Sequence, residues 1–109
     1  MLTRIIALML LLTMPATASD CGRMKQLAQE HATSMARRDS LDHAGFDDRA
    51  RRGARAENVA YGSSTLAGTM AQWWRSPGHA ANLRLPGCKA TASARSRSGR
   101  IYWAMEIGP

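Results

Sequence analysis

The sequence has two cysteines, one phenylalanine and eight acidic residues, and it lacks the common catalytic signatures. It contains no H-E-x-x-H, no C-x-x-C and no G-x-S-x-G motif. These absences exclude a zinc-protease helix, a paired-thiol site and a hydrolase nucleophile elbow. No glycine-rich phosphate loop is present, and the longest apolar run is shorter than the roughly 20 residues of a membrane-spanning helix.

The N-terminus has the organisation of a secretory signal peptide. Arg4 precedes an apolar run at 5–14, and small residues at 16–18 form a cleavage motif. We expect cleavage after Ala18 and one mature domain at 19–109, located in the periplasm or secreted. An uncleaved membrane anchor is the alternative.

The two cysteines suit an exported domain of this size. In an oxidising compartment, Cys21 and Cys88 are expected to form a disulfide worth about 4 kcal/mol for so long a loop. Two free buried thiols are the alternative.

The charge is strongly basic, because 15 lysines and arginines outnumber the 8 acids. The arginines cluster at Arg49, Arg51, Arg52 and Arg55, and again at Arg95, Arg97 and Arg100. Such clusters suit acidic envelope polymers or phospholipid head groups, or they serve as solvated surface charge. We expect no specific nucleic-acid target for an exported protein.

The mature chain begins with a helical pattern and ends with an alternating one. From Cys21 to about Arg38, apolar residues recur at spacings of three and four, which predicts an amphipathic helix. His31 lies on or beside its apolar face, which favours a core or boundary role. Alternation at 88–94 and 101–107 predicts two strands joined by a turn at 96–99.

The central part of the chain is less regular. Residues 40–62 are interpreted as irregular structure with short helical pieces, where sites are often built. Ser64 is expected to cap a helix ending near Arg75, and Ser76 to cap a short helix that contains His79. The whole pattern predicts an α+β domain with helices covering the hairpin.

Three side chains in this region have suitable chemistry for a site: His43, Glu57 and His79. Two imidazoles and a carboxylate suit a divalent metal such as zinc, with an open fourth position. They equally suit a metal-free acid–base cluster, and spacing alone decides neither. Adjacent helical residues diverge by about 100°, so Trp73 suits the core and Trp74 either a groove or the cover of the sheet.

Four short motifs, in this order, resemble the CAP superfamily of SCP-like, cysteine-rich secretory and pathogenesis-related proteins. The matching segments are H-A-G-F-D-D-R at 43–49, A-E-N-V-A-Y-G at 56–62, W-W-R-S-P-G-H-A-A-N-L at 73–83 and G-R-I-Y-W at 99–103. The resemblance covers roughly 27–108.

This resemblance implies an α-β-α sandwich, abbreviated at the N-terminus and ending in an antiparallel hairpin. It implies a cleft formed by His43, Glu57 and His79, with Asn58 as a local organiser. Trp74, placed by helical geometry, is also expected at the ligand cleft. The second cleft carboxylate of many eukaryotic members would fall at Ser76, and its absence weakens any mechanism that needs two acids.

Three functions follow as hypotheses. The first is a binding module without dedicated catalysis, whose cleft holds a divalent metal such as zinc or a small polar ligand and whose apolar groove takes a lipid, as family members that bind sterols and fatty acids suggest. The second is a metal-assisted hydrolase acting on peptide or envelope polymer, with Glu57 activating water. The third is a basic module that docks on anionic envelope polymers through Arg49, Arg51, Arg52 and Arg55. The ligand, the metal and the oligomeric state are not fixed by the sequence.

Overall fold

The structure, a computed structural model, describes residues 18–109. The predicted signal peptide lies outside the described residues except for Ala18, where the first described helix begins. The elements are α2 (Ala18–Arg38), α3 (Phe46–Arg51), β1 (Ala56–Tyr61), α4 (Leu66–Trp74), α5 (Pro77–Leu83), β2 (Lys89–Arg95) and β3 (Ile101–Ile107).

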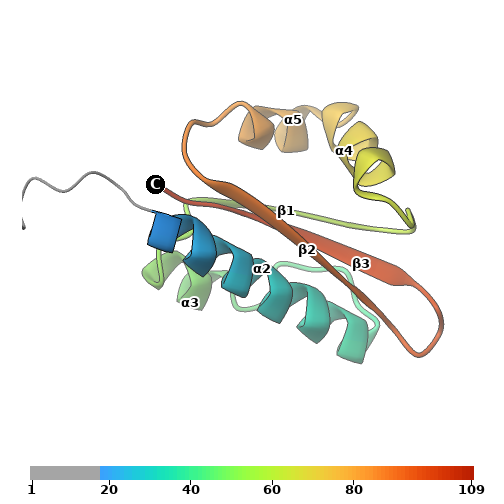
Figure 1. Cartoon of the computed structure of the whole chain (residues 1–109). Coiled ribbons are helices and arrows are strands. Elements are labelled where there is room, and N and C mark those ends of the chain that lie inside the picture. Colours follow the sequence, from blue (N-terminus) through green and yellow to red (C-terminus); the bar gives the residue numbers. More distant parts are fainter. Residues whose placement is uncertain (1–17) are drawn as a thin grey trace, which may run out of the picture.

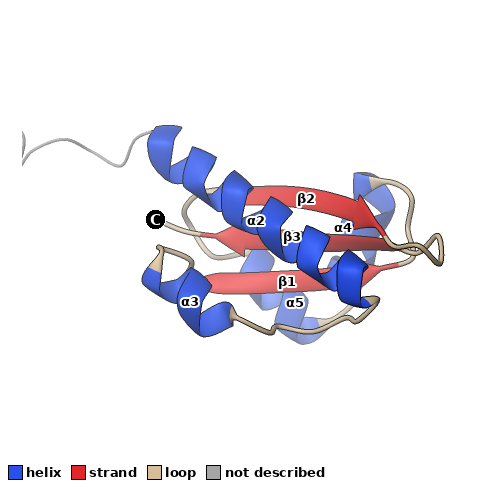
Figure 2. Ribbon diagram, turned by 90° about the horizontal axis from the view of Figure 1, so that it is seen from below, coloured by secondary structure: helices blue, strands red, loops and turns tan. Residues whose placement is uncertain are grey.

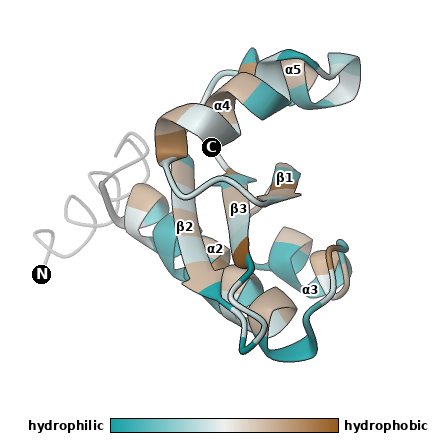
Figure 3. Ribbon diagram, turned by 90° about the vertical axis from the view of Figure 1, so that its right-hand side faces the viewer, coloured by the Kyte–Doolittle hydropathy of each residue, from teal (hydrophilic) through white to brown (hydrophobic). Residues whose placement is uncertain are grey.

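The three strands form one antiparallel sheet in the order β1-β3-β2. Helices α2 and α3 cover one face and α4 and α5 the other (Figure 1), and the end-on view in Figure 3 shows the sheet between the two helical layers. The predicted α+β fold with an α-β-α arrangement and a C-terminal hairpin is confirmed. Among residues 18–109, no helix has the length and apolar character needed to cross a membrane.

Helix α2 forms as its apolar spacing predicts, although it begins three residues before Cys21. The C-terminal part of its buried stripe packs against β2 and β3 around Ala92, Tyr102 and Ala104, and the N-terminal part packs around Ala54. The stripe consists of Met24, Leu27, Ala28, Ala32 and Met35. Asp20 in the first turn and basic residues in the last turn suit the helix dipole.

Strand β1 is absent from the sequence-based prediction, which treated 40–62 as irregular with short helical pieces. The structure shows a six-residue edge strand paired with β3 in the register Glu57↔Glu106 and Val59↔Ala104. The error arises because Ala, Glu and Asn have low strand propensity, and tertiary pairing with β3 overrides that preference.

The α4–α5 layer covers the other face of the sheet. Trp73, Leu83 and Trp103 join one core cluster, and the Trp73 indole donates to the Val59 carbonyl at 3.0 Å. The prediction of Ser64 as the cap of α4 is wrong by one residue, because the hydroxyl of Thr65 accepts from Gly68 N at 3.0 Å.

Ser76 is the N-cap of α5, as predicted, and Pro77 follows it in the first turn. The Ser76 side chain makes no capping hydrogen bond. The fixed φ of Pro77 therefore contributes more to starting this helix than the hydroxyl does.

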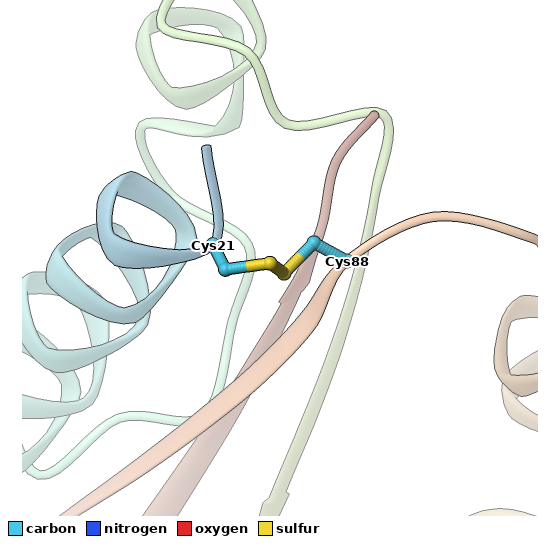
Figure 4. The surroundings of a disulfide bond; sticks show 2 residues. All are labelled: Cys21 and Cys88. Atoms are coloured by element: carbon cyan, nitrogen blue, oxygen red, sulfur yellow. A yellow bond between two sulfur atoms is a disulfide. The ribbon is translucent and has the colours of Figure 1, made fainter. Parts of the chain in front are cut away.

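The predicted disulfide between Cys21 and Cys88 is present, with a Cα–Cα separation of 5.4 Å (Figure 4). It joins the first turns of α2 to the residue preceding β2. Main-chain bonds from Cys88 N to Pro109 O and from Gly108 N to Cys88 O hold the C-terminal residues at the same place.

Candidate functional site

The centre of the candidate site is a hydrogen bond between His43 and Glu57. Glu57 projects from β1, and His43 lies in the loop between α2 and α3; His43 Nδ1 and Glu57 Oε2 are 2.6 Å apart. The Glu57 side chain is 1% exposed and that of His43 54%. An ionised carboxylate only accepts, so Nδ1–H donates, and in the neutral ring Nε2 then carries a lone pair. The pair presents an oriented imidazole to solvent.

Arg49 on α3 fixes the Glu57 carboxylate from behind. Arg49 Nε donates to Oε1 at 2.5 Å and Nη2 to Oε2 at 3.0 Å, and both side chains are buried. Arg49 Nη1 also donates to the Ala44 carbonyl at 2.9 Å, which ties down the loop that carries His43.

Gly45 makes this loop geometry possible. Its φ of 81° lies in the left-handed region, and a Cβ there would lie 3.0 Å from Arg49 Nη1. A side chain at this position would be strained and would crowd the guanidinium.

The contacts of Glu57 keep it ionised although it is buried. Burial alone would raise its pKa, but the neighbouring Glu106 carboxyl and the hydrogen bonds from Arg49 and His43 lower the pKa below its ordinary value. Glu57 is therefore a fixed negative acceptor, and its two oxygens are occupied by Arg49 and His43.

Glu106 on β3 is a second carboxyl beside the site that the sequence analysis missed. It is the cross-strand partner of Glu57 and is fully buried. Arg49 Nε lies 3.7 Å from Oε2, and the Glu57 carboxylate is the acceptor for the proton of a neutral Glu106. Burial and the nearby Glu57 carboxylate raise the pKa of Glu106 to about 10, so this group is neutral at pH 7.

A single guanidinium explains this asymmetry. Arg49 neutralises one buried carboxylate, and a second negative charge at Glu106 would have no counter-charge. The two carboxyls therefore take different protonation states, with the charge on Glu57. The available signal in the sequence was a lone Glu within the otherwise apolar run I-Y-W-A-M-E-I.

The substitution Glu106→Gln is expected to stabilise the domain increasingly as the pH rises. The folded pKa is raised from 4.5 to about 10, so folding retains a proton that the unfolded chain releases above pH 4.5. Wild-type stability is therefore lost progressively from pH 4.5 towards pH 10. Gln carries no such proton, and we expect a gain of about 1–3 kcal/mol at pH 7.

Urea unfolding of wild type and Glu106→Gln at pH 5 and pH 8 measures this effect. Glu57 and Arg49 face Glu106 directly, and His31 on α2 contacts Glu57; all three groups are present in both proteins. Asp47→Asn, at an exposed carboxylate on α3, serves as control. A gain that does not grow between the two pH values contradicts the assignment.

His31 on α2 also belongs to this cluster, and its predicted burial is confirmed at 2% exposure. Its Nε2 donates to the Asp42 carbonyl at 2.8 Å and lies 3.6 Å from Glu57 Oε2. Its Nδ1 has no partner, so a proton there would be buried and unsatisfied. Burial accordingly lowers the pKa of His31. His31 acts as a neutral packing residue beneath the site.

His79 is brought to the other side of β1 by a network of asparagines. Asn58 Nδ2 donates to the His79 carbonyl at 3.1 Å, and Asn82 Nδ2 donates to Asn58 Oδ1 at 3.0 Å. Helices α3 and α5 flank the edge strand β1 from opposite faces (Figure 2). Partial burial, and then the His43 ring when it carries a proton on both nitrogens, lower the pKa of His79. The edge strand β1 thus contacts the His43 ring through Glu57 and the His79 backbone through Asn58.

The donor set is narrower than the one expected from the sequence. Within residues 18–109, no group of three or more His, Cys, Asp or Glu side chains is arranged to hold a metal ion. The two oxygens of Glu57 already accept hydrogen bonds, whereas no hydrogen bond of His43 Nε2 or of the His79 ring is among the described contacts. Zinc binding stays a prediction.

Comparison with known families decides the assignment of the chain. Residues 13–106 match the family model described as the cysteine-rich secretory protein family, CAP. The chain belongs to the CAP family. No curated protein and no solved structure matches it significantly.

The structure also locates Trp74, which was expected at the ligand cleft, and the arginines that were expected to dock on anionic polymers. Trp74 is 48% exposed on α4, and the Arg84 guanidinium lies 5.5 Å from the centre of its ring. No described contact joins Trp74 to the His43–Glu57 pair, and its place at the ligand cleft stays a prediction. Of the arginines expected to dock on polymers, Arg49 is 7% exposed and buried against Glu57. That part of the docking prediction is wrong. Arg52 is paired with Glu30 and Asp48.

Proposed function

We propose that this CAP domain is an exported binding module whose cleft at the β1 edge binds a divalent cation such as zinc, or a small polar ligand, without dedicated catalysis. The observation that carries the proposal is the 2.6 Å hydrogen bond from the exposed His43 ring to the buried, Arg49-anchored Glu57. A carboxylate behind an imidazole fixes the ring and its tautomer and makes the outer nitrogen a better ligand.

In this proposal the chain's own residues have distinct tasks. His43 Nε2 is one donor, the neutral ring of His79 is the other, and Glu57 orients His43 without contacting the ligand. Asn58 and Asn82 hold α5, and with it His79, against β1. A bound divalent ion would act as a Lewis acid for a ligand oxygen at the remaining positions.

The state of Glu57 supports a binding role over hydrolysis. A general base must accept a proton at an available oxygen. Glu57 is buried, its pKa is lowered, and its two oxygens already accept hydrogen bonds. Export rests on the N-terminal pattern, the Cys21–Cys88 disulfide and membership of a family of secreted proteins.

The pocket beside the His43–Glu57 pair suits a small polar ligand better than a lipid. A pocket of about 270 Å³ adjoins the cluster and is lined mostly by polar and charged residues, His31, Ser34 and Arg49 among them. A larger pocket of about 750 Å³ along α2 is lined by Lys, Gln, Glu, Thr and Arg side chains. This larger pocket contains neither imidazole of the proposed site, so it does not bear on the ligand of the cleft.

Calorimetric titration of the purified domain with zinc tests the proposal. Wild type is expected to give saturable binding, and His43→Ala or His79→Ala to weaken it about tenfold or more through the loss of one of two ligands. Glu57→Gln is expected to weaken it about 10–100-fold, since the ring loses its orienting acceptor.

Asp47→Asn is the control and should bind as wild type does. Absence of heat from wild type removes the metal from the proposal. Metal-dependent turnover of a peptide or envelope polymer that is abolished by Glu57→Gln would replace the binding role with the hydrolase role.

A further inference from the structure

A second concave site lies at the C-terminal end of α2. This end of the helix approaches the turn between β2 and β3 (Figure 1). A pocket of about 420 Å³ is lined there by Arg37 from the last turns of α2 and by Arg95 and Arg97 from the end of β2 and the turn. Ala36, Ala94 and Asp39 complete most of the wall. None of these residues belongs to the His43–Glu57 cluster.

The pocket has an excess of uncompensated positive charge. Within residues 18–109, ion pairs are formed by Arg38, Arg49 and Arg52, and by none of the three pocket arginines. Three arginines thus line one concave surface, and none of them forms an ion pair with a carboxylate of the described residues.

The one acid in the wall, Asp39, is already engaged. Tyr102 OH donates to Asp39 Oδ1 at 2.7 Å, and this hydrogen bond, with help from the adjacent serines and Arg100, lowers the pKa of Asp39. The Asp39 carboxylate therefore accepts a hydrogen bond from the β2–β3 hairpin, and it forms no ion pair with the pocket arginines.

The turn that carries Arg97 and follows Arg95 is held by several hydrogen bonds. The turn at 96–99 is closed by Ser96 N to Arg100 O at 2.8 Å and by Gly99 N to Ser96 O at 3.0 Å. Buried Ser96 also accepts from Arg100 N at 3.1 Å, and Arg95 Nη1 donates to Gly99 O at 3.0 Å. Less conformational entropy is lost when such a site binds a ligand.

We propose that this pocket binds the phosphate group of a small, soluble phosphate ester, with Arg37, Arg95 and Arg97 contacting its oxygens. Guanidinium groups form paired, charge-assisted hydrogen bonds to phosphate oxygens, and a phosphate carries nearly two negative charges at pH 7. The three arginines exceed the single carboxylate by about that amount.

The pocket walls favour a soluble ester over a lipid surface. The large apolar side chains exposed on the described surface are Leu41, Tyr61, Leu66, Trp74 and Leu85, and none of them lines this pocket. The alanines leave room for a small carbon skeleton beside the phosphate and give no side chain that could insert into a bilayer.

Titration of isotope-labelled protein with glycerol 3-phosphate, followed by NMR at constant ionic strength, tests the proposal. Saturable shifts are expected at residues 94–99 and in the last turn of α2. The double variant Arg95→Gln/Arg97→Gln is expected to weaken binding about tenfold or more, because two charge-assisted contacts are lost.

Arg51→Gln/Arg55→Gln is the matched control, because it removes the same charge from exposed positions outside the pocket. It should change affinity less than about twofold at constant ionic strength. Equal weakening by the two double variants, or shifts that do not saturate, would overturn the site. Binding to phosphatidylglycerol but not phosphatidylcholine vesicles, without binding of glycerol 3-phosphate, would overturn it in favour of a lipid surface.

Discussion

Replacing Arg49 by methionine is expected to lower the free energy of unfolding by about 3–5 kcal/mol, the usual cost of breaking one side of a buried ion pair. Arg49 gives Glu57 two hydrogen bonds, at 2.5 and 3.0 Å, and lies 3.7 Å from Glu106. Without it, two carboxyls face each other across β1 and β3 with no cation between them. The variant is therefore expected to drive protonation of Glu57 or to loosen this part of the sheet.

Chemical denaturation at pH 7 measures the loss, with Arg52→Met as the matched control. Arg52 lies on the same segment and pairs with Glu30 and Asp48, but its side chain is 38% exposed. Exposed pairs contribute about 0–1 kcal/mol, so the control should stay near wild type. Similar losses in the two variants would mean that Arg49 contributes no more than a surface charge.

The sequence predicted the elements whose own pattern requires burial. The apolar stripe of α2 and the alternation of β3 are visible because each element buries one face against the other. Strand β1 shows no such pattern, because its inward residue Glu57 is stable only beside Arg49. That condition depends on residues brought together by folding, which explains why local propensity failed there.

The candidate site was likewise predictable only in part. The motif order predicted a site formed by His43, Glu57 and His79. In the structure His43 is hydrogen-bonded to Glu57, and His79 lies on the other side of β1. The burial of Arg49 could not be predicted, because its sequence neighbours include Arg51, Arg52 and Arg55 and such a cluster is typical of solvated surface charge. Glu106 was hidden because only the β1–β3 register makes it the neighbour of Glu57.

The second large effect is expected from the disulfide. Cys21 and Cys88 are 67 residues apart in the sequence, and closing a loop of that length restricts the unfolded chain by about 4 kcal/mol. A domain of this size has about 5–15 kcal/mol of stability in total. We therefore expect Cys21→Ser/Cys88→Ser to fold with a much smaller margin, and reduction of wild type to cause the same loss.

The location of the bridge predicts which part of the molecule responds first. The C-terminal end of α2 is held by the ion pair between Arg38 and Asp42 and by the hydrogen bond from Tyr102 to Asp39. At the N-terminal end, the disulfide of Cys21 joins the first turns covalently to the rest of the fold. Amide exchange in the reduced protein should therefore rise most in the first turns of α2, and a reductant should leave the double-serine variant unchanged. Uniform exchange along α2, or equal stability with and without the bridge, would show that core packing of Met24 and Leu27 alone holds this end of the helix.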